Sequence, residues 1–292
     1  NPTAEMSGVT MDDYLLQGPK QALDVVSDIT NADTIDIIGL CMGGALTAIF
    51  AAYLAGSGDD RLGNLTLLNT MLDYSDPGVL ALFTDASAVK RLDRKMAKSG
   101  YLEGESMAGT FDVLRANDLI FNYVVSNWLL GQSPPAFDIL AWNADSTRMP
   151  AAMHSFYLRN FYVENAIAAG DLELAGQRIN LRDIKHNVYI VSAINDHIVP
   201  WTSGYKTTQL LGGKSRFVLS SSGHIAGIVN PPSPKAKHWV NDSLPADPHE
   251  WRANAEVVDA TWWQDWTAWI AERGGEMVPA PDRPGDRGRG RA

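Results

Sequence analysis

Short β-branched runs alternate with apolar helical stretches in the first part of the chain. Residues 19–31 place apolar side chains at helical spacing, which predicts an amphipathic helix. Residues 34–38 then form a β-branched run that stops at glycine, and residues 43–53 are an apolar helical stretch. This order of helix, strand, tight turn and helix is typical of a parallel sheet with covered faces. The apolar positions of the first helix are Ala22, Val25, Val26 and Ile29.

Further strands are predicted at residues 65–68, 187–191 and 216–219, with a helix at 202–211 before the last of them. Connections between a strand and a helix in such folds are usually about 2–6 residues long. Residues 72–180 are therefore an insertion with its own helices, expected around 108–115 and 117–130. We expect this insertion to form a cap over the carboxyl edge of the sheet, where such folds keep their sites.

The end of the chain contains one more strong element. Residues 259–272 predict a helix packed on the core through an apolar stripe. The stripe is made of Trp262, Trp266, Trp269 and Ile270. Residues 279–292 are rich in Pro, Gly and Arg and too poor in apolar residues to fold. The predicted organisation is a core made of 1–71 and 181–278, a cap of 72–180 and a disordered tail of 279–292.

Composition narrows the possible functions of the chain. The 292 residues hold 24 Lys and Arg against 34 Asp and Glu, a net charge of −10, which argues against non-specific binding of nucleic acid. No apolar run approaches the ~20 residues that span a bilayer. The single cysteine, Cys41, excludes an intrachain disulfide framework and a multi-cysteine zinc site, so we expect no bound metal. The chain opens on Asn1 with loop-like residues, and we expect it to be a piece of a longer protein.

The turn between the first strand and its helix carries the candidate nucleophile. Residues 39–44 read Gly-Leu-Cys-Met-Gly-Gly, the nucleophile elbow G-x-S-x-G with sulfur in place of the hydroxyl. Glycines two residues to either side of Cys41 would let strand and helix approach, and the helix N-terminus favours a thiolate. The N–H of Met42 would face the oxyanion. The alternative is that Cys41 is only a small buried apolar residue.

Two partners follow in the order expected for an α/β-hydrolase. Asp196 comes after the strand at 187–191, and His224 comes after the strand at 216–219. His224 would exchange a proton with the thiol, and Asp196 would hold the imidazole in the right tautomer. The alternatives are that Asp196 caps the helix beginning near Pro200 and that His224 is a turn residue in solvent. His197 is a further candidate for contact with substrate.

The remaining histidines fit this role less well. His154 lies in the expected cap, and His186 precedes its strand. His238 and His249 fall in chain that we expect to be irregular and rich in proline. A sulfur nucleophile can exchange one thioester for another at little cost, so the chemistry fits either a cysteine acyltransferase or a cysteine hydrolase.

Several separate motifs together resemble the polyhydroxyalkanoate synthase family. They are the elbow at 39–44, residues 195–201, 222–227 and 230–232, the cap segments 142–150 and 156–160, and residues 262–266. The resemblance extends from Asn1 to about Arg273. It implies an α/β-hydrolase fold, a mostly parallel sheet with a helical cap insertion. It also implies that strands preceding Asn1 complete the sheet in family members.

The family resemblance implies polymerisation of (R)-3-hydroxyacyl-CoA into a polyester, with short-chain monomers such as 3-hydroxybutyryl-CoA. Cys41, Asp196 and His224 would form its triad, with no cofactor besides the acyl-CoA substrate. Arg159 is a candidate for CoA phosphates and Trp201 for substrate contact, although Arg159 fits equally well as a locally paired surface residue. The resemblance further implies a homodimer on polyester granules in the cytoplasm. The competing hypotheses are a cysteine hydrolase of the dienelactone type and a non-catalytic granule-binding scaffold.

Overall fold

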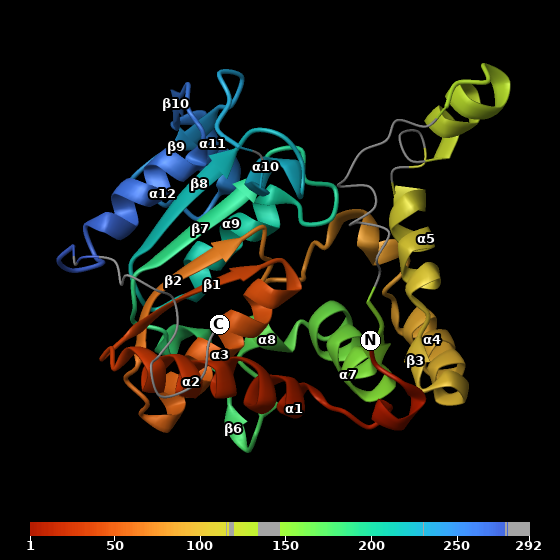
Figure 1. Ribbon diagram of the computed structural model, residues 1–292, viewed down its shortest axis with the longest axis horizontal. Helices are drawn as coiled ribbons and strands as arrows, with labels where there is room; N and C mark the ends of the chain where they lie inside the picture. Colours follow the sequence, from red (N-terminus) through yellow and green to blue (C-terminus); the bar gives the residue numbers. More distant parts are fainter. Residues whose placement is uncertain (115, 117–119, 134–146, 230, 278, 280–292) are drawn as a thin grey trace. The chain divides into compact units, whose positions relative to one another are not determined.

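The computed structural model describes the chain except residues 115, 117–119, 134–146, 230, 278 and 280–292 (Figure 1). It divides into two compact units. One consists of Asn1–Tyr14 and Gly78–Asn165, and the other of Leu15–Pro77 and Ala166–Ala292. The sequence predicts cap boundaries at 71/72 and 180/181 and places the first 14 residues in the core. The compact units instead divide at 14/15, 77/78 and 165/166. The expected tail and part of the cap motif at 142–150 lie outside the described residues, as does Asn230.

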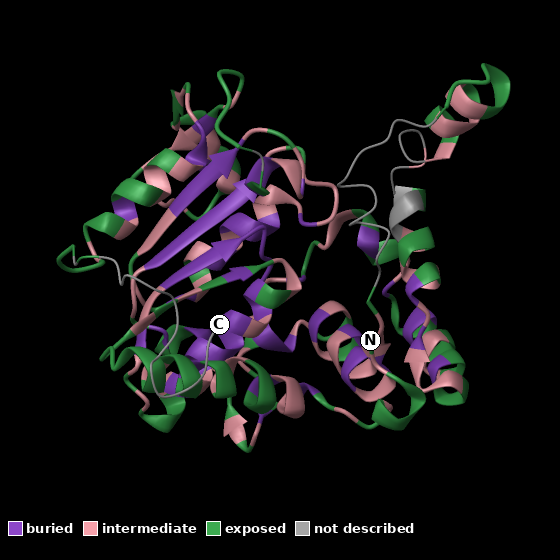
Figure 2. Ribbon diagram, viewed as in Figure 1, coloured by how far each residue is buried: buried purple, intermediate pink, exposed green. Residues whose placement is uncertain are grey.

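The larger unit is built on a six-stranded sheet with the order β1-β2-β7-β8-β9-β10. The parallel strands are β1 (Ile35–Leu40), β2 (Leu62–Leu68), β7 (Val188–Ala193) and β8 (Ser215–Ser220). Each of these strands was expected from the sequence at nearly the same place. All of β7 is buried, as the colouring of the central strands shows (Figure 2). The prediction of a mostly parallel sheet with covered faces is confirmed.

Two short strands that the sequence did not predict extend this sheet. β9 (His238–Val240) pairs antiparallel with β8, and β10 (Glu256–Val258) pairs antiparallel with β9. The expectation of irregular chain at His238 and His249 is wrong. His238 is buried and its Nδ1 lies 2.8 Å from the carbonyl oxygen of Ala260, while His249 lies in helix α11 (Pro248–Ala253). Three-residue strands show too little alternation to be found by periodicity.

Helices cover both faces of this sheet. On one face, Tyr205 of α9 (Trp201–Leu210) and Trp251 of α11 pack edge-on against Phe217. On the other face, α12 (Trp262–Ala271) buries Trp262 and Trp269 in a cluster with strand residues such as Tyr189. The predicted packing of the tryptophan stripe on the core is confirmed.

A polar contact fixes α12 in register with the strands. Asp265 accepts hydrogen bonds from Tyr189 Oη at 2.7 Å and from Arg216 Nε at 2.8 Å, and Trp266 Nε1 donates to Thr66 Oγ1 at 3.0 Å. The ion pair with Arg216 holds the pKa of Asp265 below its usual range, against the effect of burial, which by itself raises it.

The first helix differs from its prediction. The π-helical turn η2 (Leu16–Lys20) leads into α2 (Gln21–Thr30), in which Leu23 is the buried residue. The exposed fractions of Val25, Val26 and Ile29 are 50%, 38% and 49%. The spacing correctly predicted a helix, and three of the apolar positions that defined it are exposed in the described chain. Between α2 and the elbow, β1 also exposes Ile38 at 53%.

The smaller unit is mostly helical. Its first residues pair with α7 (Ala151–Tyr157), because the N–H of Met153 donates to the carbonyl of Val9 at 3.1 Å. One expected helix is α5 (Gly104–Leu114); the second is described in part as the π-helical η5 (Val124–Leu129). The other elements of this unit are η1 (Ala4–Met6), η3 (Gly78–Leu82), α4 (Ala86–Ser99), β3 (Tyr101–Leu102), β4 (Met149–Pro150) and η6 (Leu158–Val163).

The remaining elements are one long helix and several short helices and strands. Helix α1 (Met11–Leu15) ends where the chain passes from one unit to the other. The larger unit also contains α3 (Met42–Ser57), α8 (Ala166–Ala169), β5 (Glu173–Leu174), β6 (Gln177–Arg178), η7 (Leu181–Asp183) and α10 (Ala226–Val229). Among the described residues, no helix has both the length and the apolar character needed to cross a bilayer.

Candidate active site

Cys41 occupies the turn between β1 and α3. Its backbone has φ 54° and ψ −122°, a conformation that residues other than glycine rarely adopt. The N–H of Cys41 donates to the carbonyl of Leu68 at 2.8 Å, which ties the turn to the end of β2. Its side chain is half-buried at the N-cap of α3. The elbow expected from the sequence is therefore present as a strained backbone turn.

The glycines around Cys41 have different roles. A Cβ on Gly39 would lie 2.5 Å from Thr47 Oγ1 and 2.6 Å from the Cα of Gly44, so this position admits no side chain. A Cβ on Gly44 would collide with the side chain of Thr70, whereas one on Gly43 would meet nothing within 4 Å. The expectation that Gly43 permits the close approach is wrong, because it is Gly44, one residue later, that packs against Gly39 and Thr70.

His224 and Asp196 meet at the carboxyl ends of β8 and β7. The Nδ1 atom of His224 lies 2.6 Å from Asp196 Oδ2. The other carboxylate oxygen accepts hydrogen bonds from the N–H groups of Ile198 at 2.8 Å and Val199 at 2.9 Å. The exposed fraction is 7% for the imidazole and 0% for the carboxylate. Because these three contacts fix both oxygens, Asp196 holds the imidazole in one orientation.

The pKa of His224 depends on its burial and on its contacts with Asp196 and Cys41. Burial by itself lowers this pKa, but hydrogen bonds to Asp196 and to the Cys41 side chain outweigh it and raise the pKa to about 10. With Nδ1 facing the carboxylate, the ring leaves Nε2 for the sulfur. The structure thus brings together the three side chains that the sequence singled out.

The alternative interpretations of these residues fit the structure poorly. Helix α9 has Pro200 at its N-cap and no side-chain capping bond, so Asp196 does not cap it. His224 is buried rather than a turn residue in solvent. Cys41 is half-buried and contacts a buried imidazole, which a small apolar core residue does not need.

Two residues that the sequence analysis missed support this arrangement. Asn69, fully buried with φ 43°, donates from Nδ2 to the carbonyl of His224. Thr70 Oγ1 donates to the carbonyl of Leu68 at 3.1 Å and lies 3.5 Å from that of Cys41. The signal was available: a polar pair directly after a buried parallel strand belongs at the same sheet edge as the elbow.

The other predicted residues lie in different surroundings. Met42 is the first residue of α3, so its N–H has no acceptor within the helix and remains available to an oxyanion. His197 is half-buried beside Asp196, and Trp201 packs edge-on against His249 at 5.7 Å between ring centroids. Arg159, in the smaller unit, forms an ion pair with Asp93 and donates from Nε to Ser155 Oγ at 3.2 Å. No cluster of three or more metal-ligating side chains occurs in the part of the chain that the structure describes.

Comparison with known proteins identifies the family to which this chain belongs. Residues 20–231 match the family model described as alpha/beta hydrolase fold. The chain belongs to the α/β-hydrolase fold family. Its sequence is 42% identical over 293 aligned residues to a poly(3-hydroxyalkanoate) polymerase subunit of Cupriavidus necator, covering 98% of this chain and 50% of that one. It is 40% identical to poly(3-hydroxyalkanoate) polymerase 1 of Ectopseudomonas oleovorans, over 98% of this chain and 51% of the relative.

These relatives confirm the resemblance drawn from the motifs. The chain spans about half the length of the curated relatives it matches. Among solved structures, a hydrolase from Pseudomonas aeruginosa is similar over 74% of this chain and 67% of that one, with 15% identity and a TM-score of 0.43.

Proposed function

We propose that the protein is a polyester synthase that transfers (R)-3-hydroxyacyl groups from CoA thioesters to a growing polyhydroxyalkanoate chain. The observation that supports this best is the contact of the Cys41 thiol with an imidazole that Asp196 orients. The names of the relatives support the polymer chemistry over other reactions of the same fold. In this proposal Cys41, His224 and Asp196 act as a triad.

The first step loads the acyl group onto the enzyme. The sulfur of Cys41 attacks the thioester carbonyl, forming a new carbon–sulfur bond, and the bond from the acyl carbon to the CoA sulfur breaks. The proton of the Cys41 thiol passes to His224, whose raised pKa favours the imidazolium, and from there to the departing CoA sulfur. The N–H of Met42 donates to the oxyanion of the tetrahedral intermediate. One thioester replaces another, so the acyl group stays activated.

The second step lengthens the polymer. The 3-hydroxyl oxygen of one unit attacks the acyl carbon on Cys41, an ester bond forms, and the bond to the Cys41 sulfur breaks. His224 takes the hydroxyl proton, and Asp196 stabilises the imidazolium that forms. Conversion of a thioester into an ester runs downhill, which drives growth.

Further parts of the proposal concern substrate and assembly. Short-chain monomers such as 3-hydroxybutyryl-CoA, a homodimer and association with cytoplasmic polymer granules follow from the family resemblance. His197 and Trp201 are candidates for contact with substrate, His197 because it is adjacent to Asp196. A role for Arg159 on CoA phosphates has less support, because its guanidinium is already paired with Asp93. The local pairing that the sequence left open as an alternative accounts for Arg159 as it stands.

The test supplies the purified protein with 3-hydroxybutyryl-CoA and measures free CoA together with insoluble polyester. We expect both products from the wild type and neither from Cys41→Ala. Asp242→Asn is a matched control, because this carboxylate is 96% exposed on the surface. Release of CoA with only soluble hydroxyacid would instead identify a cysteine hydrolase. Granule binding that Cys41→Ala leaves intact, with no turnover by the wild type, would identify a scaffold.

A further inference from the structure

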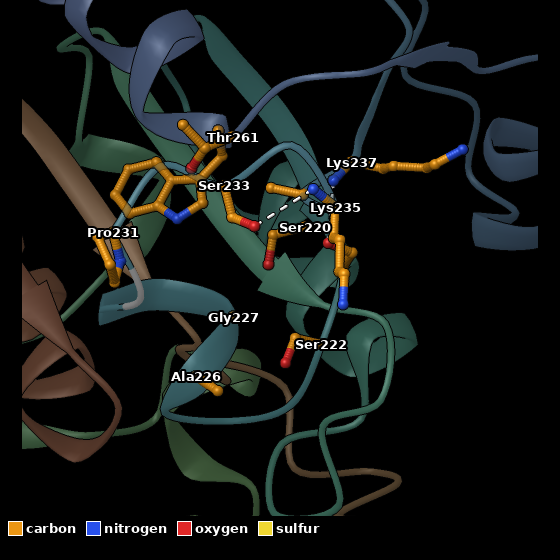
Figure 3. A pocket seen from close by; sticks show the side chains of 12 residues that line it. Ser220, Ser222, Ala226, Gly227, Pro231, Ser233, Lys235, Lys237 and Thr261 are labelled. Atoms are coloured by element: carbon orange, nitrogen blue, oxygen red, sulfur yellow. Dashed lines mark hydrogen bonds between the residues drawn. The ribbon is translucent and has the colours of Figure 1, made fainter. Parts of the chain in front are cut away.

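A cavity of about 270 Å³ lies beside the segment that carries His224. Its wall includes the end of β8, the turn at 220–222, Ala226 and Gly227 of α10, chain from 231 to 237, and the start of α12 (Figure 3). Cys41 and the other two members of the candidate triad do not line it. The cavity is therefore separate from the candidate active site, although His224 lies two residues before Ala226.

Two buried polar atoms belong to residues of this wall. Ser220 and Trp262 are each 2% exposed, and among the described residues neither Ser220 Oγ nor Trp262 Nε1 has a hydrogen-bond partner. Buried donors in folded proteins are normally paired, since an unpaired donor has lost its water. Two other tryptophans are paired: Trp266 Nε1 donates to Thr66 Oγ1 at 3.0 Å, and Trp251 Nε1 to the carbonyl of Asn241 at 3.3 Å, whereas Trp239 Nε1 also has no partner among the described residues.

The chemistry of the wall indicates what would complete these bonds. An indole N–H and an ammonium group can only donate, and a serine hydroxyl can donate. The described residues around the cavity include Lys235 and no carboxylate. In Figure 3 the Lys235 side chain extends toward Ser222, whereas Lys237 extends away from the other labelled side chains. Lys237 is paired with Asp259, at 3.1 Å. The unpaired donors beneath the cavity floor and the ammonium at its rim would therefore be satisfied by acceptor oxygens.

We propose that this cavity binds a small oxyanion, the carboxylate or phosphate group of a small molecule. Trp262 Nε1 and Ser220 Oγ lie just under the cavity floor and would donate to its oxygens after a small movement of the wall, and Lys235 would balance its charge at the exposed rim. The methyl of Ala226 and the ring of Pro231 offer apolar surface to a short alkyl chain. The proposal does not depend on the polyester synthase activity.

Occupancy of this cavity also bears on the neighbouring histidine. A Cβ on Gly227 would lie 3.0 Å from Ser220 Oγ, so α10 packs closely on the cavity floor. The N–H of Gly227 donates to the carbonyl of Gly223 at 2.8 Å, which places His224 inside the same turn. A bound anion would therefore restrict the turn that positions His224.

Binding is measured without reference to activity. The full protein is labelled with 5-fluorotryptophan and titrated with inorganic phosphate, with sodium 3-hydroxybutyrate and with CoA, and sodium chloride at equal ionic strength is the blank. The signal of Trp262 is identified by its loss in Trp262→Phe. We expect this signal to shift in a saturable way, while the signals of Trp266 and Trp251 stay in place. Which titrant acts at the lowest concentration distinguishes a carboxylate from a free or CoA-borne phosphate.

Two variants and a matched control make the test specific. Ser220→Ala and Lys235→Gln should each weaken binding about 5-fold or more, whereas Lys237→Gln, which removes an outward-facing ammonium, should change it less than about 2-fold. Calorimetry on the same proteins gives the affinities if the tryptophan variant does not fold. No saturable response to any of the three titrants up to tens of millimolar, or an equal response to chloride, would overturn the proposal and leave a cavity filled by water only.

Discussion

Cys41 combines an unfavourable backbone conformation with a position that exposes its sulfur to His224. A residue at φ 54° and ψ −122° costs on the order of 1–3 kcal/mol relative to a relaxed turn, and surrounding contacts must hold it there. The bond from its N–H to the carbonyl of Leu68 and the close packing at Gly39 supply those contacts. Strain at this residue therefore follows from placing a side chain where two elements meet most closely.

Substitutions at Cys41 and at Asp196 should reduce turnover to different extents. Cys41→Ala removes the atom that holds the acyl group, so CoA release should fall to the rate without enzyme. Asp196→Asn keeps the ring in place but stops balancing the imidazolium, and we expect a loss of at least about 10-fold with measurable activity remaining. Steady-state release of CoA measures both, and circular dichroism checks the fold. Comparable turnover by Cys41→Ala and the wild type would contradict the assignment of the nucleophile.

The raised pKa of His224 makes stability depend on alkaline pH. Its pKa is about 10 in the folded protein and about 6.5 in the unfolded chain, so between these values the folded state binds more protons. This contribution to the free energy of unfolding is complete below pH 6.5 and is lost as the pH rises toward 10. Urea unfolding at pH 6, 8 and 9.5 should show this fall in the wild type and a smaller one in Asp196→Asn. If the free energy of unfolding fell equally with pH in the two proteins, the contact with Asp196 would not be what raises the pKa of His224.

At the scale of elements, the contact between α3 and the chain that follows β2 should be sensitive to an added methyl at Gly44 and not at Gly43. Alanine at Gly44 would drive its methyl into Thr70, which costs about 1–3 kcal/mol in the free energy of unfolding. Alanine at Gly43 meets nothing and gains helix propensity, so its effect should lie between zero and a stabilisation of about 1 kcal/mol. Chemical denaturation of both variants gives the comparison. Equal destabilisation by the two alanines would show that the glycines matter for backbone conformation rather than for space.

How far the sequence predicted these elements depends on the length of each pattern. The runs that became β1, β2, β7 and β8 are apolar over several residues, and the tryptophan stripe of α12 repeats over three turns. The carboxyl ends of parallel strands meet at one edge, so Cys41, Asp196 and His224 could be placed together from their order alone. β9 and β10 are three residues long and carry no comparable signal. Asn69 was missed although its place directly after β2 carries the same signal; only its bond to the carbonyl of His224, 155 residues away in sequence, shows what its side chain does.

At the scale of the whole molecule, helical spacing alone could not tell what each apolar face covers. α2 and β1 have the patterns of packed elements, yet Val25, Ile29 and Ile38 are each about half exposed in the described chain. β1 is also the outermost strand of the described sheet on that side. The chain spans about half the length of its relatives. How far a residue is buried depends on everything that packs against it. A pattern can thus predict an element correctly and leave its partner undetermined.

The two units should lose stability at opposite ends of the pH range. In the smaller unit, burial lowers the pKa of His154 to about 4, against the attraction of Asp93. The unfolded chain then binds more protons between about pH 6.5 and 4, so the stability that neutral His154 contributes is present above pH 6.5 and is lost as the pH falls. His224 has the reverse effect in the larger unit, because its pKa is raised.

Hydrogen exchange, corrected for the intrinsic rate at each pH, can separate these effects. At pH 5 we expect protection to fall first in α7, where His154 is 4% exposed, and at pH 9.5 to fall first around β8 and α10. His154→Leu removes the titrating group and should preserve the protection of α7 at pH 5. The matched variant His249→Leu, in α11 of the larger unit, should leave the acid response of α7 as it is in the wild type. Loss of protection in both units together at pH 5 would mean that they unfold as one cooperative body, and the separate pH windows would then not apply.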